Sequence, residues 1–346
     1  MEKRVASVLL EYQPLIHELP VKPQSMRNRA TSNDDSTVSH WRETWLANIK
    51  ANKARFGEFA DHSVGELYKA HEHKPCIVAG SGPSLKLNAE ALKDRGSIPL
   101  VSCLHNFHYF EDLGVKPEAY VSLDCQKVVL EEVSEGGSKS EDEYWEATAD
   151  HTLVAYIGSD PELLERWRGK VYLFTAPLPD SKLNQEIDEI EYFNAGFSSG
   201  GNVLGSCVYL ARAVYGCYHT IYVGADFSFG YPDLSTGEAV HRFHSWQSKY
   251  DEKMGKTVRV TDIFGNKVHT WPSYYNFKNF FDWLACHVPG EYWNCTEGGC
   301  LGAYPQGNIS AFKYLPLKDA LKQIKMHDEV GPGWLDPKCE TRKILY

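Results

Sequence analysis

The sequence contains no long hydrophobic run. No segment of the 346 residues approaches the roughly eighteen consecutive apolar residues that a membrane-spanning helix needs. The segment Met1–Pro20 carries only the apolar run Val8–Leu10, which Glu11 ends, and this run is too short for the apolar core of a signal peptide. We therefore expect no membrane partner and a cytoplasmic location.

Paired cysteines and an excess of positive charge are also missing. None of the nine cysteines forms a Cys-x-x-Cys pair, which argues against a zinc ribbon and a disulfide framework and indicates a reducing compartment. The 46 acidic residues outnumber the 36 basic ones, and the formal charge of −10 disfavours a generic nucleic-acid or anionic-membrane surface. A small activated donor fits this charge better.

The sequence does contain enough apolar residues for a full core. With 346 residues, of which 42% are hydrophobic, the chain can bury a full core, and its length suits one large domain with an appendage or two modest domains. We predict a partly helical N-terminal extension over residues 1–73, an α/β domain over residues 74–325 and a C-terminal tail over residues 326–346.

The N-terminal extension changes character along its length. Pro20, Pro23, Asn28 and the polar run Thr31–Ser36 predict a loop or a partly disordered link. From Ser39 onward, apolar residues recur at helical spacing, and a second helical segment follows at Val64–Tyr68. The sequence leaves open whether these helices serve a partner, a second subunit of a homo-oligomer or the domain itself.

From Lys74 onward, short apolar strands alternate with helices. Parallel sheets with helices on both faces have this pattern. We therefore predict an open, mostly parallel, doubly wound (Rossmann-like) α/β sheet. The predicted strands are 76–79, 99–103, 119–123, 152–157, 171–174, 220–223 and 292–295, and the predicted helices are 85–92, 107–113, 163–167, 203–215, 276–286 and 317–326.

Two stretches lack a clear period. Residues 133–142 are rich in Gly, Ser and Glu, and they predict a surface insertion. Residues 227–275 predict few regular elements. Long irregular stretches in compact domains are often active-site covers.

The first candidate site is a glycine-rich turn between a predicted strand and a predicted helix. It consists of Gly80, Ser81, Gly82, Pro83 and Ser84. Glycines in this place let backbone N–H groups approach a phosphate at a helix N-terminus. The full dinucleotide fingerprint is not present, because Leu85 stands where the third glycine belongs. Taken alone, the turn is equally consistent with an ordinary tight turn.

Asp124 and Asp226 each follow the carboxyl end of a predicted strand. Ligands of open parallel sheets collect at this edge. The two carboxylates are therefore candidates to bind a ribose, an acceptor or a metal ion. The alternative for each residue is a turn former or a helix cap, which aspartate commonly provides after a strand.

A second glycine-rich helix entry lies at Ser198–Asn202. Gly200, Gly201 and Asn202 precede a helix whose free N–H groups and positive dipole end could hold another negative group. Simple capping of that helix is the alternative.

His241 and His244 lie three residues apart in the irregular region. Histidine titrates nearest to neutral pH, so either residue is a candidate acid/base group. The alternatives are ordinary surface histidines or a metal site shared with Asp226 or Asp233.

The segment Asn294–Gly299 places an amide, a hydroxyl, a carboxylate and two glycines in succession after a strand. Asn294, Thr296 and Glu297 are candidates to recognise a base or a sugar, and a polar turn is the alternative. Nothing in the sequence lowers the pKa of Cys295, so we do not expect a nucleophilic thiol there.

These motifs, in this order, resemble the 6-hydroxymethylpterin diphosphokinase MptE-like family, which includes the flagellin-modifying motility accessory factors. The resemblance spans about residues 74–302 and rests on Ile77–Leu85, Pro117, Val121–Asp124, Gly200–Val203, Gly224–Phe229 and Asn294–Gly299. The first motif also resembles the donor loop of bacterial sialyltransferases that use a cytidine-monophosphate sugar. The sequence departs from the family pattern at Ala225, where glutamine is common, and in the insertion Tyr231–Asp233.

The resemblance implies a transferase with a nucleotide-activated donor. The first reading is a glycosyltransferase of the motility accessory factor type, which uses a CMP- or UDP-sugar. Gly80–Ser84 would then hold the phosphate, Asn294–Glu297 the nucleotide, and Asp226 with His241 or His244 would serve catalysis.

Two other readings stay open. An ATP-dependent 6-hydroxymethylpterin diphosphokinase would use Asp124 and Asp226 to hold magnesium. A non-catalytic nucleotide-binding interaction protein would use the same turn without chemistry. The acceptor, which could be a protein, a glycan or a pterin, is not fixed by the sequence.

Overall fold

The computed structural model describes residues 13–176, 178, 180–196, 200–231 and 257–330. For residues 23, 26–36 and 327–330 the backbone alone is described. The chain divides into two compact units. The first unit comprises Met1–Met26, His73–Ile98 and Cys217–Tyr346, and the second comprises Arg27–Glu72 and Pro99–Gly216. The boundaries expected after residues 73 and 325 stay predictions.

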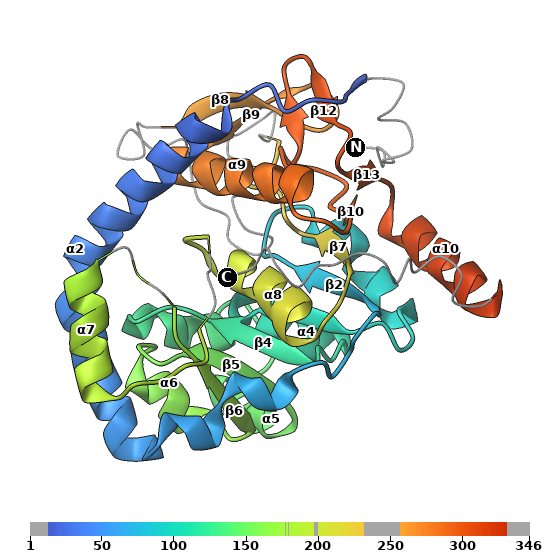
Figure 1. The fold of residues 1–346 in the computed structure, drawn as a ribbon. Coiled ribbons are helices and arrows are strands. Elements are labelled where there is room, and N and C mark those ends of the chain that lie inside the picture. Colours follow the sequence, from blue (N-terminus) through green and yellow to red (C-terminus); the bar gives the residue numbers. More distant parts are fainter. Residues whose placement is uncertain (1–12, 177, 179, 197–199, 232–256, 331–346) are drawn as a thin grey trace. The chain divides into compact units, whose positions relative to one another are not determined.

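Four parallel strands form the central sheet of the first unit, in the order β13, β10, β7, β2 (Figure 1). β2 and β7 are buried over their whole length, as expected for apolar strands of a covered parallel sheet. The elements of this sheet are β2 (Pro75–Ala79), β7 (His219–Val223), β10 (Glu291–Asn294) and β13 (Lys313–Tyr314), with the helices α3 (Leu85–Asn88), η4 (Ala89–Asp94), α9 (Pro272–His287) and α10 (Leu317–Val330).

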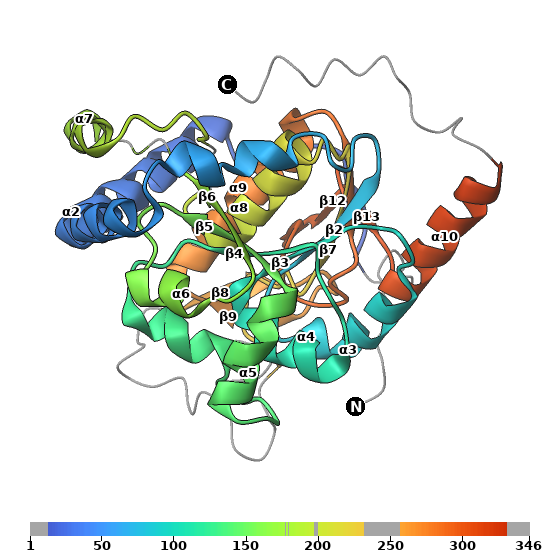
Figure 2. The ribbon, with the colours of Figure 1, turned by 90° about the horizontal axis from the view of Figure 1, so that it is seen from below.

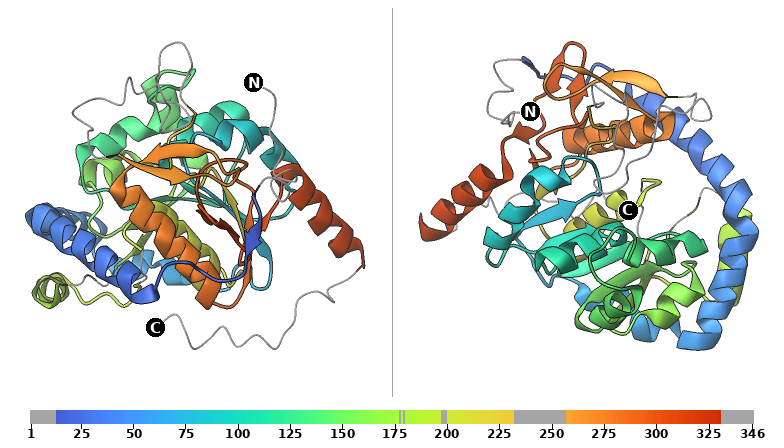
Figure 3. Two further views of the ribbon diagram at one scale, coloured as in Figure 1. Left: turned by 90° about the horizontal axis from the view of Figure 1, so that it is seen from above. Right: turned by 180° about the vertical axis from the view of Figure 1, so that it is seen from behind.

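Smaller strands complete the first unit. A three-stranded sheet has the order β1, β12, β11, and β8 pairs with β9 in an antiparallel hairpin. Figure 3 shows the hairpin beside the short strands of the C-terminal part, and β8 contacts β11. These strands are β1 (Leu15–Ile16), β8 (Val258–Thr261), β9 (Lys267–Thr270), β11 (Ala303–Tyr304) and β12 (Gly307–Ile309).

The second unit contains four further parallel strands, in the order β3, β4, β5, β6. The strands are β3 (Leu100–Cys103), β4 (Ala119–Ser122), β5 (Thr152–Tyr156) and β6 (Lys170–Phe174). The helices are α2 (Pro23–Phe56), which begins in the first unit, and η2 (Phe59–His62), η3 (Val64–Leu67), η5 (Leu104–Asn106), α4 (Phe107–Leu113), η6 (Lys127–Val133), α5 (Glu141–Ala147), η7 (Thr148–Asp150), α6 (Pro161–Arg166), α7 (Ser181–Ile190), α8 (Val203–Tyr209) and η8 (Leu210–Val214).

Eight parallel strands with flanking helices confirm the predicted open α/β fold class. Each of the seven predicted strands is present, and its ends agree with the structure within one residue. The helix predicted at 203–215 is α8 followed by the π-helical turn η8, and the helix predicted at 85–92 is the short α3 followed by the 3₁₀ turns of η4.

The loop predicted at Thr31–Ser36 is wrong, because these residues lie inside the 34-residue helix α2. Pro23 occupies the first helical position, where proline is favoured, and no glycine or proline interrupts the helix from Gln24 to Phe56. Ser, Thr, Asn and Asp each cost less than about 1 kcal/mol in a helix. Such a cost shifts a local prediction, but it does not break a long helix. Gly57, in a left-handed conformation, ends α2.

The expected irregular stretch 227–275 is wrong in its second half, where β8, β9 and the start of α9 lie. Asp262 closes the hairpin, because its carboxylate accepts the N–H groups of Phe264 at 2.9 Å and Asn266 at 2.7 Å. The signal for this hairpin was the Gly265-Asn266 pair between two short strands that contain valine.

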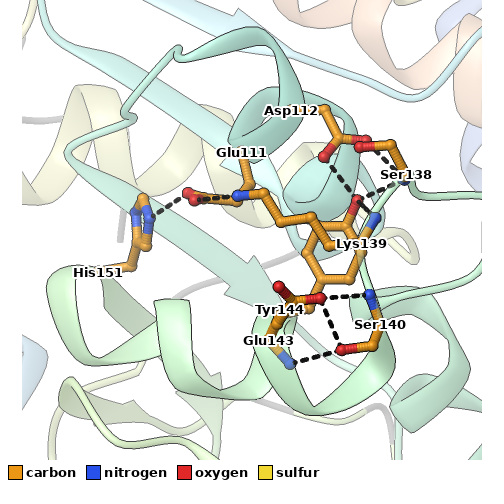
Figure 4. A network of polar contacts seen from close by, with 8 residues as sticks. All are labelled: Glu111, Asp112, Ser138, Lys139, Ser140, Glu143, Tyr144 and His151. Atoms are coloured by element: carbon orange, nitrogen blue, oxygen red, sulfur yellow. Dashed lines mark hydrogen bonds and ion pairs between the residues drawn. The ribbon is translucent and has the colours of Figure 1, made fainter.

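The insertion predicted at residues 133–142 is a loop that the second unit holds firmly (Figure 4). The Tyr144 hydroxyl donates to Asp112 at 2.6 Å and accepts the N–H of Ser138 at 2.7 Å. Lys139 contacts Glu111, which also contacts His151. The loop ends at a capping box of Ser140 and Glu143 that begins α5, a helix that the sequence prediction missed.

The helix α2 packs onto the carboxyl-end loops of β4 and β5 in the second unit. Asn48 Nδ2 donates to the carbonyl groups of Cys125 at 2.9 Å and Gly158 at 3.1 Å. Asn52 Nδ2 donates to those of Ile157 at 2.8 Å and Ser159 at 3.0 Å. α7, a second helix that the sequence prediction missed, lies beside α2 (Figures 1 and 2). Arg42 of α2 forms ion pairs with Asp180, which caps α7, and with Glu186 of α7.

In the part of the chain that the structure describes, no helix is long and apolar enough to cross a membrane.

Candidate functional site

The loops that follow β2, β7 and β10 lie at one edge of the first unit's sheet, because neighbouring parallel strands end on the same side. From β7 the chain continues toward β10, which lies on the side of β7 away from β2. From β2 it continues into the second unit instead. The edge between β2 and β7 is therefore a topological switch point, the place where open α/β sheets bind ligands.

Glycines allow these loops to touch backbone to backbone. A Cβ on Gly80 would lie 2.5 Å from the carbonyl oxygen of Gly224, and a Cβ on Gly82 would overlap the Asp226 carboxylate. A Cβ on Gly299 would overlap the Asp226 backbone. The three loops are thus packed around Asp226 with no room for side chains at these positions.

Asp226 joins the loop after β7 to the glycine-rich turn. Its carboxylate accepts the Ser84 hydroxyl at 2.8 Å and the Ser84 N–H at 3.2 Å. Its backbone carbonyl accepts the N–H of Cys300 at 2.7 Å. Asp226 is buried, with 4% of its surface exposed. The side chain therefore holds two loops together.

Burial raises the pKa of Asp226 to about 7, although the hydrogen bonds from Ser84 act in the opposite direction. A buried carboxylate is costly to ionise unless a charge compensates it, and Ser84 offers only neutral donors. This carboxyl group therefore changes its charge near neutral pH.

Most of the backbone N–H groups in the turn are used within the fold. Gly80 donates to Val223 at 2.9 Å, Gly82 donates to Gly224 at 2.8 Å, and Ser84 donates to Asp226. Pro83 has no N–H. Among the described residues, Ser81 makes no hydrogen bond, and its half-buried side chain and N–H are the polar groups of the turn that remain for a ligand.

The candidates in the loop after β10 also make internal contacts. Asn294 accepts the N–H of Thr296 at 3.0 Å and donates to the carbonyl of Leu301 at 3.0 Å. The Thr296 hydroxyl accepts the N–H of Ala225 at 3.3 Å. Glu297 accepts the N–H of Leu317 at 3.1 Å, at the start of α10. These contacts give the three residues a role in building the edge, and their part in nucleotide binding stays a prediction.

Two residues at this edge have a left-handed backbone that non-glycine residues seldom adopt. Phe227 has φ 51° and Glu297 has φ 60°. The carbonyl of Phe227 accepts the Thr270 hydroxyl at 2.6 Å and the Cys300 thiol at 3.3 Å, which hold the conformation in place. Strained backbone of this kind clusters at functional sites.

Burial keeps the nearby thiols protonated. It raises the pKa of Cys300 to about 12 and raises that of Cys295 well above its ordinary value. Neither thiol is suited to nucleophilic attack at neutral pH, since the thiolate is the reactive form.

The remaining predicted site residues lie elsewhere. Asp124 is exposed in the second unit, and its backbone carbonyl accepts the N–H of Asp160 at 3.2 Å. Asn202 caps α8 by accepting the N–H of Gly205 at 3.0 Å, and Gly200 and Gly201 precede it. His241 and His244 lie outside the described residues. Catalytic and donor-binding roles for all of these residues stay predictions.

A metal role for Asp124 with Asp226 also stays a prediction. The Asp226 carboxylate is used by Ser84, and the two aspartates lie in different units. Within the described ranges, no three His, Cys, Asp or Glu side chains gather as a metal site.

The sequence prediction missed the residues that brace the site. Asn88 Nδ2 donates to the carbonyl of Cys295 at 2.8 Å, across 207 residues of sequence. Thr270 and Cys300 act on the backbone of Phe227. Such contacts leave no local signature, because each partner is ordinary in its own sequence context.

The family model that describes the 6-hydroxymethylpterin diphosphokinase MptE-like proteins matches residues 43–232. The chain belongs to this family. The match includes the turn Gly80–Ser84, Asp124, the entry to α8 and Asp226, and it begins within α2. The resemblance seen in the sequence is therefore confirmed, and the segment Asn294–Gly299 lies beyond the matched residues.

Among solved structures, the fold is similar to a structure described as the MAf glycosyltransferase from Magnetospirillum magneticum AMB-1. The TM-score is 0.53 at 15% sequence identity, and the likeness covers 82% of this chain but 40% of that one. At this identity the likeness shows the fold. No curated protein sequence matches the chain.

Proposed function

We propose that the chain is a transferase that binds a nucleotide-activated sugar at the β2–β7 edge and transfers the sugar to an acceptor. The observation that carries this proposal is the convergence of three glycine-bearing loops around Asp226 at the topological switch point. Membership of the MptE-like family and the fold shared with a glycosyltransferase support it.

In this proposal Ser81 is the group of the turn that contacts the donor phosphate, because the other polar groups of the turn are used within the fold. Asp226 acts through Ser84 as a positioning residue. Transfer from a nucleotide donor depends mainly on orientation of the reactants and on stabilising the departing phosphate. A rigid edge built by loop packing suits that task.

A second candidate is an ATP-dependent diphosphokinase, which the family's own description favours. That reaction requires magnesium on the ATP phosphates. In the described fold, the Asp226 carboxylate accepts the Ser84 hydroxyl.

The test is a thermal-shift and calorimetric titration of the full chain with CMP-sugars, UDP-sugars, and ATP with magnesium. We expect stabilisation by one nucleotide sugar and its slow turnover in the presence of acceptor extracts. Stabilisation by ATP with magnesium alone would contradict the sugar proposal in favour of the diphosphokinase. Binding without turnover of any donor would favour the non-catalytic reading.

Two serine variants separate ligand contact from fold. Ser81→Ala should weaken donor binding about tenfold, the usual scale for one lost hydrogen bond to a charged group, and should leave the melting temperature unchanged. Ser84→Ala is the matched comparison, and it should lower the melting temperature because it removes a buried donor to Asp226. Unchanged donor affinity in Ser81→Ala would remove Ser81 from the site.

A further inference from the structure

A fully buried ion pair lies on α9, outside the motifs considered so far. Lys278 Nζ is 2.7 Å from Asp282 Oδ2, and neither side chain has any exposed surface. The two residues are four apart on the helix, so they share one face. Removing two charges from water is costly even when they attract each other, and replacing a buried ion pair by apolar residues of similar volume is often neutral or stabilising. Packing alone therefore does not explain these two charges.

The Asp282 carboxylate accepts two further hydrogen bonds, both from the chain that follows β10. Oδ1 accepts the N–H of Gly302 at 2.8 Å, and Oδ2 accepts the Tyr304 hydroxyl at 2.8 Å. Lys278 Nζ also lies 3.4 Å from the centre of the Tyr304 ring, a cation–π contact. The pair thus fixes the start of β11 and the residues before it.

The same segment forms one wall of the candidate site. Two residues before Gly302, the N–H of Cys300 donates to the carbonyl of Asp226 at 2.7 Å. Gly299 packs against the Asp226 backbone, and Gly298 packs against Ser84. A carboxylate that holds Gly302 therefore sets the position of the loop that presses on Asp226.

We propose that Asp282, with Lys278 as its counter-ion, is a positioning residue that holds the Cys295–Gly302 loop against Asp226 and so keeps the donor-binding edge assembled. The effect on donor binding rests on the proposed function, whereas the effect on the position of the loop does not.

Two double variants test the proposal, and both remove the ion pair. Lys278→Met with Asp282→Leu removes the acceptor of the Gly302 N–H and leaves the Tyr304 hydroxyl only its longer contact with Asn279, at 3.4 Å. Lys278→Met with Asp282→Asn retains an oxygen for the Gly302 N–H. Hydrogen exchange of the amides at residues 299–302 is measured by mass spectrometry, with the β2 and β7 amides as internal reference. Asp319→Asn on α10, whose exposed partner is Lys322, is the control substitution.

We expect exchange at 299–302 to be at least tenfold faster in the leucine variant than in the asparagine variant, with the β2 and β7 amides and the control unchanged. Equal exchange in the two double variants, or acceleration spread evenly over the unit, would overturn the proposal. Should the leucine variant fail to fold, Tyr304→Phe removes one donor and keeps the ring. It should accelerate the same amides at least threefold, and no acceleration would overturn the proposal.

Calorimetric titration with the donor nucleotide then tests the link to binding. The leucine variant should bind at least fivefold more weakly than the asparagine variant, and equal affinities would overturn the link. If the unmodified protein binds no nucleotide, the proposed function fails while the exchange comparison still decides the positioning role.

Discussion

At the residue scale, Asp226 determines how the candidate edge is built. Its carboxylate reaches Ser84 in the turn after β2, and its backbone reaches Cys300 in the loop after β10. The group is buried among neutral donors, so its ionisation works against the stability of the folded state. The residue that assembles the site is therefore also sensitive to pH.

The stability of the protein should depend on pH through Asp226. Its pKa is about 7 in the fold and about 4 in an unfolded chain, so the folded state binds more protons between these values. The contribution to the free energy of unfolding is fully present below pH about 4 and is lost as the pH rises through 7, by up to about 1.4 kcal/mol per pH unit. Asp226→Asn should reduce this slope, as measured by urea denaturation at pH 5, 6, 7 and 8.

Asp262 and Asp282, whose pKa values burial also raises, should retain part of the slope in that variant. A variant with the same slope as the unmodified protein would show that Asp226 is not the responsible group.

Gly82→Ala should disrupt the turn. The new Cβ would overlap the Asp226 carboxylate and would lie 2.7 Å from the Gly224 carbonyl, and overpacking of this kind costs about 1–3 kcal/mol or more. Gly96→Ala is the control, because Gly96 has open space around it, so that the alanine pays only for its left-handed backbone, about 1–2 kcal/mol. Chemical denaturation measures both, and equal losses would mean that the loops at Asp226 do not pack closely.

At the element scale, α2 belongs to the core of the second unit. Its asparagines donate to carbonyl groups in the loops after β4 and β5, and Ile49, between them, is fully buried. The sequence predicted a partly helical extension over residues 1–73 and left open whether its helices serve a partner, a second subunit or the domain itself. The packing of α2 shows that the strand loops need these donors, since buried carbonyl groups without partners are costly.

Asn52→Ala should therefore lower the free energy of unfolding by about 2 kcal/mol, since it leaves the carbonyl groups of Ile157 and Ser159 without a donor. Lys50→Ala, at an exposed position of the same helix, should change stability by less than about 0.5 kcal/mol. Guanidinium denaturation with tryptophan fluorescence is the measurement. Similar values for the two variants would assign α2 a peripheral role.

At the scale of the whole molecule, the accessibility of the cysteine thiols tests how tightly the interiors of the two units are packed. The eight described cysteines are all free thiols, and Cys286 is the exposed one among them. The others lie in the interior of both units, where cysteine acts as a small apolar residue.

In a Cys339→Ser background, which removes the cysteine outside the described residues, we expect one thiol per chain to react with a disulfide reagent under native conditions. All eight should react in guanidinium. The native reaction should be slow, because partial desolvation of the Cys286 sulfur and the nearby Asp282 carboxylate raise the pKa of this thiol to about 11. A Cys286→Ser variant should lose the native reaction, and several fast native thiols would contradict the burial of the remaining seven.

The sequence by itself determined the central strands, the fold class and the family. Short apolar runs that end in glycine or aspartate are a strong local signal for buried strands. Their alternation with helical segments indicates a parallel sheet covered on both faces. The turn Gly80–Ser84, Asp226 and Asn294–Gly299 were found because glycine and polar residues directly after a strand are a local signal. The helices α5 and α7 and the hairpin β8–β9 were missed, since short amphipathic segments between loops have weak periods.

Only the tertiary structure decided what those site residues do. Ser84 meets Asp226 across 142 residues of sequence, and Asp282 meets Gly302 across 20. The sequence left Asp226 as a candidate for a ribose, an acceptor or a metal ion, or as a turn former, and the fold shows its carboxylate accepting hydrogen bonds from Ser84. The reason is physical: a carboxylate's role depends on which donors surround it, and those donors come from segments that the sheet brings together.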